Sequence, residues 1–154
     1  MIRYLKQHGL RLCGGLVLAL TLASPVLADK QSDQEKLAIG TWYGEFSPGP
    51  NQPLQRFINT RQADGSYTVQ ARLYEKGRFI SELRNRGLWG ISNGLYYTVT
   101  TEVNGEKTDL KNPEVTHPYL VRSINPTVFE YQHIASGNKF RVLRVDPATV
   151  RLPD

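Results

Sequence analysis

The stretch Gly40-Thr41-Trp42-Tyr43-Gly44-Glu45-Phe46 decides the fold, because it alternates like a β-strand and opens a series of hairpin signals. Trp42, Gly44 and Phe46 fall on one face of this strand, since successive side chains point to opposite sides. The glycines on either side of the tryptophan carry no side chain, so the indole can lie close to neighbouring backbone. A tryptophan placed in this way is expected to close one end of a small barrel.

Four turn signals follow at intervals of roughly 8–14 residues, the spacing of a small sandwich or barrel. They separate predicted strands over residues 54–61, 66–75, 78–92 and 95–103, and they are Asp64-Gly65, Lys76-Gly77, Asn93-Gly94 and Asn104-Gly105. Asn-Gly and Asp-Gly favour the positive φ angles of tight hairpin turns. The segment 78–92 is long for one strand, and Gly87 and Gly90 predict a bend or bulge around Trp89.

Three more strands are predicted after a loop at 106–116. The first begins at His117 or Tyr119 and ends at Ile124, and the others cover residues 127–134 and 139–145. The one helix signal is Ser32 with Glu35 three positions later, which predicts either a short capped helix or a frayed end. The fold class is therefore all-β: an eight-stranded antiparallel up-and-down barrel with at most a short N-terminal helical segment. Closure is favoured because it removes the unpaired strand edges that promote aggregation.

Residues 1–28 have the pattern of a cleaved secretory signal. Basic residues precede the apolar run 16–23, and Val26-Leu27-Ala28 supplies a cleavage site. The run is shorter than the about 20 apolar residues that span a bilayer, so we expect no membrane insertion of the mature chain, 29–154, which forms a single domain. Cys13 is the one cysteine of the chain and lies before the apolar run, which argues against a lipoprotein signal and leaves the mature domain without disulfides. We expect the periplasm of a Gram-negative bacterium, or secretion, as the location.

The charge balance gives no support to a nucleic-acid partner. The formal net charge is +5, but three of the 19 basic residues lie in the leader, which leaves 16 basic against 14 acidic residues. Charges of both signs alternate along the strands rather than cluster. We therefore expect no binding to nucleic acid, and no protein partner is predicted by charge.

Gly40-Thr41-Trp42 on the first strand of an eight-stranded meander, with a basic residue late on the last strand, resembles the lipocalins and the wider calycin barrels. In that family the tryptophan closes the narrow end of the barrel, and an arginine from the last strand packs across its ring. The resemblance implies a structural closure by Gly40, Trp42 and an arginine. Arg144 is expected in this role rather than Arg141, because the end of the last strand lies beside the start of the first. The chain departs from the family in having no helix after the last strand.

A binding barrel needs aromatic walls and a few orienting polar groups on its inward faces. The alternation in segments 66–75 and 95–103 places Tyr67, Tyr97 and Thr101 inside. The predicted ligand-binding residues are Trp42, Tyr67, Tyr97, Thr101 and Arg56, with Trp89 and Gln132 as further inward candidates. Arg56 and Gln132 would favour a polar or anionic ligand over plain lipid. Whether the interior holds a cavity or is packed solid stays open at this point.

No nucleophile with a base, carboxylate pair, metal cluster or phosphate loop stands out, so we expect no enzyme, no cofactor and no metal. His117 and His133 are expected at the surface or rim. The predicted function is binding of a small amphipathic or hydrophobic molecule inside the barrel. The alternative is a surface protein-interaction or inhibitor module with a solid core. Ser136-Gly137-Asn138-Lys139-Phe140 resembles the Ser-Gly-x-x-Tyr loop of periplasmic lysozyme inhibitors, with phenylalanine in place of tyrosine.

Overall fold

The computed structural model describes residues 33–154, so the predicted leader and Ser32 lie outside the described part of the chain. A short helix over residues 33–38 precedes the first strand. The elements that follow are β1 (Gly40–Phe46), β2 (Leu54–Arg61), β3 (Ser66–Glu75), β4 (Arg78–Ser92), β5 (Leu95–Val103), β6 (Glu106–Lys107), the 3-10 helix η1 (Pro113–Val115), β7 (Thr116–Ile124), β8 (Val128–His133) and β9 (Lys139–Arg144). The predicted strands agree with these bounds to within one residue at each end, and for β7 this holds for the predicted start at His117 but not for the alternative start at Tyr119.

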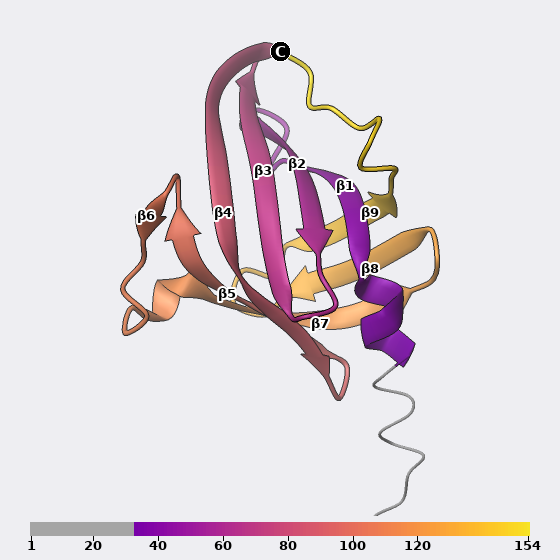
Figure 1. Ribbon diagram of the computed structural model, residues 1–154. Helices are drawn as coiled ribbons and strands as arrows, with labels where there is room; N and C mark the ends of the chain where they lie inside the picture. Colours follow the sequence, from indigo (N-terminus) through magenta and orange to yellow (C-terminus); the bar gives the residue numbers. More distant parts are fainter. Residues whose placement is uncertain (1–32) are drawn as a thin grey trace, which may run out of the picture.

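Eight strands close into an antiparallel up-and-down barrel within the described chain, as predicted (Figure 1). β1 to β5 pair in sequence order, β5 pairs with β7, and β7 to β9 continue the ring. The pairing of β9 with β1 closes it. Within residues 33–154 no helix is long and apolar enough to cross a membrane.

The predicted hairpin turns set the strand order. Lys76, Asn93 and Asn104 have φ angles of 50°, 51° and 51°, and the glycine after each is also positive. These are the angles of tight two-residue turns, whose twist matches that of paired strands. The Asn104-Gly105 turn folds the chain straight back onto β5, so the predicted loop at 106–116 begins with the two-residue strand β6.

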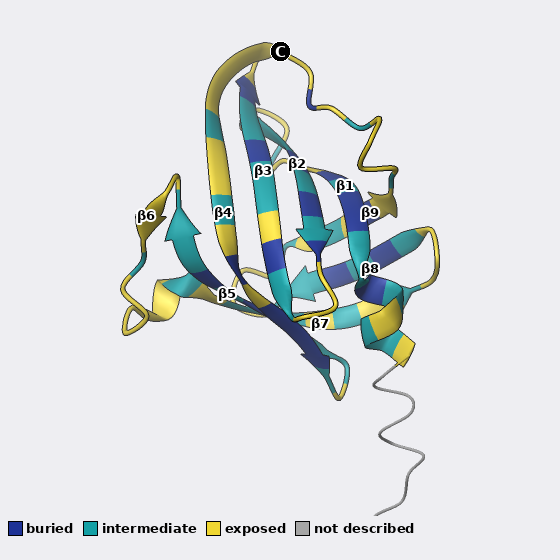
Figure 2. Ribbon diagram, in the orientation of Figure 1, coloured by how far each residue is buried: buried dark blue, intermediate teal, exposed yellow. Residues whose placement is uncertain are grey.

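β4 is the longest strand, and it bends where the glycines predicted a bend. Its register against β5 shifts between Arg86 and Gly87, which leaves Thr101 as the extra residue of a bulge. A side chain at position 87 would collide with the backbone carbonyl of Val99, so glycine is needed there. Figure 2 shows the result: the first half of β4 is mostly exposed and the second half is mostly buried.

One end of the barrel is closed by Trp42, which is completely buried. Its Nε1 donates a hydrogen bond of 2.9 Å to the carbonyl of Ala38, at the end of the short helix. Arg144 lies across the indole, with its guanidinium carbon 4.3 Å from the ring centroid. The same guanidinium donates to the carbonyls of Leu37, Ile39 and Pro126. The last carbonyls of a helix have no partner within the helix. Here Trp42 and Arg144 supply hydrogen-bond donors to them.

Gly40 completes this closure. A side chain on Gly40 would collide with the Arg144 guanidinium, and the φ angle of Gly40 is 123°. That backbone conformation is one that residues with a Cβ rarely adopt. The structure therefore brings Gly40, Trp42 and Arg144 together, whereas Arg141 points outward and pairs with Glu130 at 3.4 Å.

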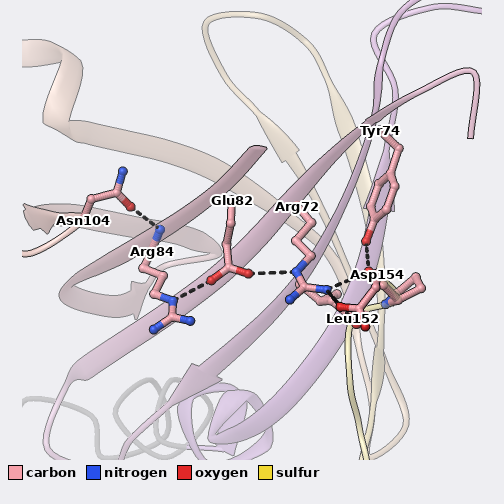
Figure 3. A network of polar contacts seen from close by, with 8 residues as sticks. Arg72, Tyr74, Glu82, Arg84, Asn104, Leu152 and Asp154 are labelled. Carbon is pink, nitrogen blue, oxygen red and sulfur yellow. Dashed lines mark hydrogen bonds and ion pairs between the residues drawn. The ribbon is translucent and has the colours of Figure 1, made fainter. Parts of the chain in front are cut away.

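The chain after β9 runs back along the outside of the barrel to the end of the β3–β4 hairpin (Figure 1). There the Arg72 guanidinium donates to the carbonyls of Leu152 and Pro153 and pairs with Asp154 at 2.8 Å (Figure 3). Glu82 holds Arg72 from the other side at 2.8 Å. Leu152 is buried, at 7% exposure, so the tail is docked on the barrel wall.

Candidate ligand-binding site

The barrel holds a cavity of about 290 Å³ above its closed end, and the cavity is open to solvent. Its walls are inward-facing side chains of seven strands: Gln55, Phe57, Asn59, Tyr67, Val69, Asn85, Thr98, Thr100, His117, Tyr119, Tyr131 and Phe140. A dry cavity of about 150 Å³ in another protein binds benzene. By that scale this one takes a molecule of roughly twelve non-hydrogen atoms.

The walls combine aromatic rings with hydroxyl groups. Tyr131 and Phe140 stack with ring centroids 5.2 Å apart, and the Tyr119 ring meets Tyr131 edge-on at the same centroid distance. On the opposite wall the Tyr67 hydroxyl lies 2.8 Å from the Thr100 hydroxyl. Apolar walls with a few placed polar groups are what small-molecule sites share.

Arg61 lies beneath these walls, toward the closed end, and is 1% exposed. Its Nε and Nη2 donate to the Tyr96 hydroxyl at 3.1 and 2.9 Å. Its guanidinium carbon lies 4.8, 5.1 and 6.0 Å from the ring centroids of Tyr96, Phe129 and Tyr131. No carboxylate of residues 33–154 forms an ion pair with Arg61, although a buried charge ordinarily requires a partner.

Three buried polar atoms around the cavity have no hydrogen-bond partner among the described residues. They are Nη1 of Arg61 and the side-chain oxygens of Asn59 and Asn85. Leaving such an atom unpaired in a buried position costs about 1–3 kcal/mol, so these three atoms lower the stability of the barrel. Asn59 and Asn85 both line the cavity.

The tyrosines of the site carry neutral hydroxyl groups. Burial raises the pKa of Tyr67, Tyr119 and Tyr131, and the positive charge of Arg61 offsets only part of that rise. These hydroxyls therefore remain hydrogen-bond donors at physiological pH.

His117 lies in the cavity wall, with its ring centroid 6.0 Å from that of His133. Burial lowers its pKa, and His133 lowers it further. His133 accepts from the backbone amide of Ser136, and the Ser136 hydroxyl lies 2.8 Å from the same ring nitrogen. These contacts stabilise the turn between β8 and β9. Within residues 33–154 no group of three His, Cys, Asp or Glu side chains could hold a metal ion.

Of the predicted binding residues, Tyr67 lies in the cavity wall, and Trp42 forms part of the core beneath it. Trp89 is also buried toward the closed end, where its Nε1 donates to the carbonyl of Gln62 at 3.1 Å. The prediction was wrong for Arg56 and Gln132, which face outward. Arg56 pairs with Glu45 at 2.9 Å, and Gln132 accepts from Arg122.

The inward placement of Tyr97 and Thr101 was also wrong. Tyr97 is 39% exposed and covers Gly90 of the neighbouring strand, where any side chain would collide with its ring. Thr101 sits in the β5 bulge and donates to the carbonyl of Arg86. The alternation of β5 was assigned by placing the apolar residues inside. On β5 the opposite set, Tyr96, Thr98 and Thr100, is buried, so this strand contributes two threonine hydroxyls to an interior that is otherwise mostly aromatic and aliphatic.

Sequence reasoning missed Arg61 and Asn59, although a signal for them was present. Phe57 is a natural core residue in β2, and the two-residue period then places Asn59 and Arg61 on the same inward face. A charged residue beside a turn is ordinarily assigned to the surface, so Arg61 was not considered as an inward residue despite this period.

A second and larger hollow, of about 710 Å³, lies on the outer face of β2, β3 and β4. Its arginines already have carboxylate partners: Arg84 pairs with Glu82 at 2.6 Å, and Arg86 lies 3.8 Å from Glu102. The interior cavity, with unpaired buried groups, is the stronger candidate site. No protein-family model and no curated protein matches this chain.

Proposed function

We propose that this protein is a non-catalytic binding barrel of the cell envelope, lipocalin-like in kind, that holds a small amphipathic molecule in its interior. The observation that carries the proposal is the aromatic-walled cavity of about 290 Å³ with the unpaired side-chain oxygens of Asn59 and Asn85 on its walls. A packed interior would have favoured the alternative, an interaction or inhibitor module. The predicted leader supports export to the periplasm.

Native mass spectrometry of the protein purified from the periplasm of an expressing bacterium tests the proposal. We expect a co-purifying mass below a few hundred daltons that is released on denaturation. Free ligand should also raise the melting temperature, because it binds the folded state alone.

A matched pair of variants locates the ligand. Val69→Phe adds a ring to the cavity wall, whereas Thr68→Phe adds the same ring on the exposed face of β3. Val69→Phe should purify without the bound small molecule, and Thr68→Phe should still purify with it. A small mass that persists in Val69→Phe, or a co-purifying protein in place of a small molecule, would contradict the interior site.

A further inference from the structure

We infer that the ligand of the interior cavity carries an anionic head group, a carboxylate or a like oxyanion, that is received by Arg61 and the tyrosine hydroxyls around it. The inference rests on the proposed interior binding and adds the chemical class of the ligand. Three observations support it: the missing counter-charge of Arg61, the donor character of the groups around it, and the placement of a second arginine nearby.

The missing counter-charge is the strongest of these. A guanidinium stays protonated at any physiological pH, so Arg61 is a permanent positive charge at 1% exposure. Aromatic rings and one hydroxyl partly compensate for its lost hydration. Its Nη1 still lacks a partner among the described residues. An oxyanion is the natural complement, because arginine binds carboxylates through parallel N–H donors.

The groups around Arg61 are donors rather than competing anions. Tyr67, Tyr119 and Tyr131 line the cavity, and the guanidinium carbon of Arg61 lies 6.0 Å from the Tyr131 ring centroid. Burial raises the pKa of all three hydroxyls, and the positive charge of Arg61 opposes that rise. The hydroxyl of Thr98 lines the cavity beside them. Several neutral O–H donors beside one guanidinium favour a negative oxygen over a neutral one.

Arg144 adds a second positive charge on the other side of the closed end. The two arginines are near one another because Arg61 pairs with Gly40 in the register of β1 and β2, and Gly40 lies against the Arg144 guanidinium. Burial lowers the pKa of Arg144, and the positive charge of Arg61 lowers it further. An anion above Arg61 would relieve this repulsion. The unpaired oxygens of Asn59 and Asn85 are left for a polar substituent on the body of the ligand.

Matched acid and amide probes test the inference, because each pair differs in charge and hardly in shape. The pairs are benzoate with benzamide, cinnamate with cinnamamide, and indole-3-acetate with indole-3-acetamide, all of a size that the cavity admits. Titration calorimetry at neutral pH should show at least one acid binding roughly tenfold or more tighter than its amide. The thermal shift should follow the same order.

Arg56→Met is the matched control for Arg61→Met, since both arginines lie on β2 and only Arg61 faces inward. The acid preference should persist in Arg56→Met and disappear in Arg61→Met. If Arg61→Met fails to fold, Tyr67→Phe and Tyr131→Phe keep the packing, remove one donor each, and should lower acid affinity several-fold more than amide affinity.

The outcomes separate the two proposals. Amides that bind as tightly as their acids would overturn the anionic head group and leave interior binding standing. An acid preference that survives in Arg61→Met would overturn the role of Arg61. No binding of any probe at millimolar concentration would overturn both the head group and the interior site.

Discussion

The closed end and the cavity floor each hold a buried aromatic ring covered by an arginine, yet the two regions differ in how their polar groups are paired. At the closed end Arg144 covers Trp42 and donates to three backbone carbonyls, and the indole nitrogen has its own acceptor. At the floor Arg61 contacts three rings and donates to the Tyr96 hydroxyl, while its Nη1 has no partner among the described residues.

This difference in the pairing of polar groups distinguishes a region that stabilises the fold from a region that is a candidate for binding. Folding selects for satisfied polar groups, because each unsatisfied one lowers stability. Sites where a folded protein leaves such groups unpaired are where function most often resides. The closed end is therefore the part of the barrel built for stability, and the region of the cavity and Arg61 is where buried donors and acceptors stay unpaired, which is the basis of the proposed binding.

The largest expected effect comes from breaking the closed end. Trp42→Ala removes a completely buried indole and should lower the free energy of unfolding by about 3–5 kcal/mol, a large part of the stability of a domain of this size. Chemical denaturation followed by circular dichroism measures this loss. Tyr97→Ala is the control, because it removes a similar ring from the outer face and should cost far less. Similar losses for the two variants would show that Trp42 does not close the barrel.

The sequence predicted the barrel well because its turns are strongly encoded. The Asn-Gly pairs at Asn93 and Asn104 have the positive φ angles that these dipeptides favour, and they fixed strand bounds and order. The closure by Gly40, Trp42 and an arginine came from the resemblance to the lipocalins, and the antiparallel order of the last and first strands selected Arg144 over Arg141. β6 was missed because two residues are too short to show a period.

The candidate site was predicted less well because the faces of β5 were assigned by placing its apolar residues inside. β5 has its apolar residues Leu95, Tyr97 and Val99 outside and its threonines inside, so the usual assignment reverses the strand. The bulge at Thr101 changes the phase again. No rule of periodicity reveals that a strand turns its threonines toward a cavity. That information lies in the pairing of β5 with Gly87 and Gly90 of β4, which a single strand does not contain.

A smaller effect on stability is expected when Arg61 and Arg144 are replaced, and it tests the difference between them. The double variant Arg61→Met with Tyr96→Phe replaces an internal polar pair by apolar groups of similar size. Such replacements are often neutral or stabilising, so its free energy of unfolding should stay within about 1 kcal/mol of the wild type or rise. Arg144→Met leaves three carbonyls without their donor and should lose about 1 kcal/mol. Thermal and urea unfolding measure the stability of both variants. A double variant less stable than Arg144→Met would show that Arg61 stabilises the fold.

The smallest effect concerns a third arginine, Arg72, which holds the tail to the outside of the barrel and has its partners in place (Figure 3). Hydrogen bonds from Arg72, and then from Arg84, lower the pKa of Glu82 to about 2. Because this pKa is lower in the folded protein than in the unfolded chain, the Glu82 contribution is fully present above about pH 4.5 and is lost as the pH falls toward 2.

The methyl resonances of Leu152 report this loss, since Leu152 is buried only while the tail is docked. They should keep their native positions down to about pH 4 and shift toward those of an exposed leucine as the pH falls further. Glu82→Gln should partly release the tail already at neutral pH. Glu75→Gln, an exposed carboxylate on the same hairpin, serves as the control and should leave the tail docked. Leu152 signals that follow the same pH course in Glu82→Gln and in the wild type would show that the tail is held without the Arg72–Glu82 pair.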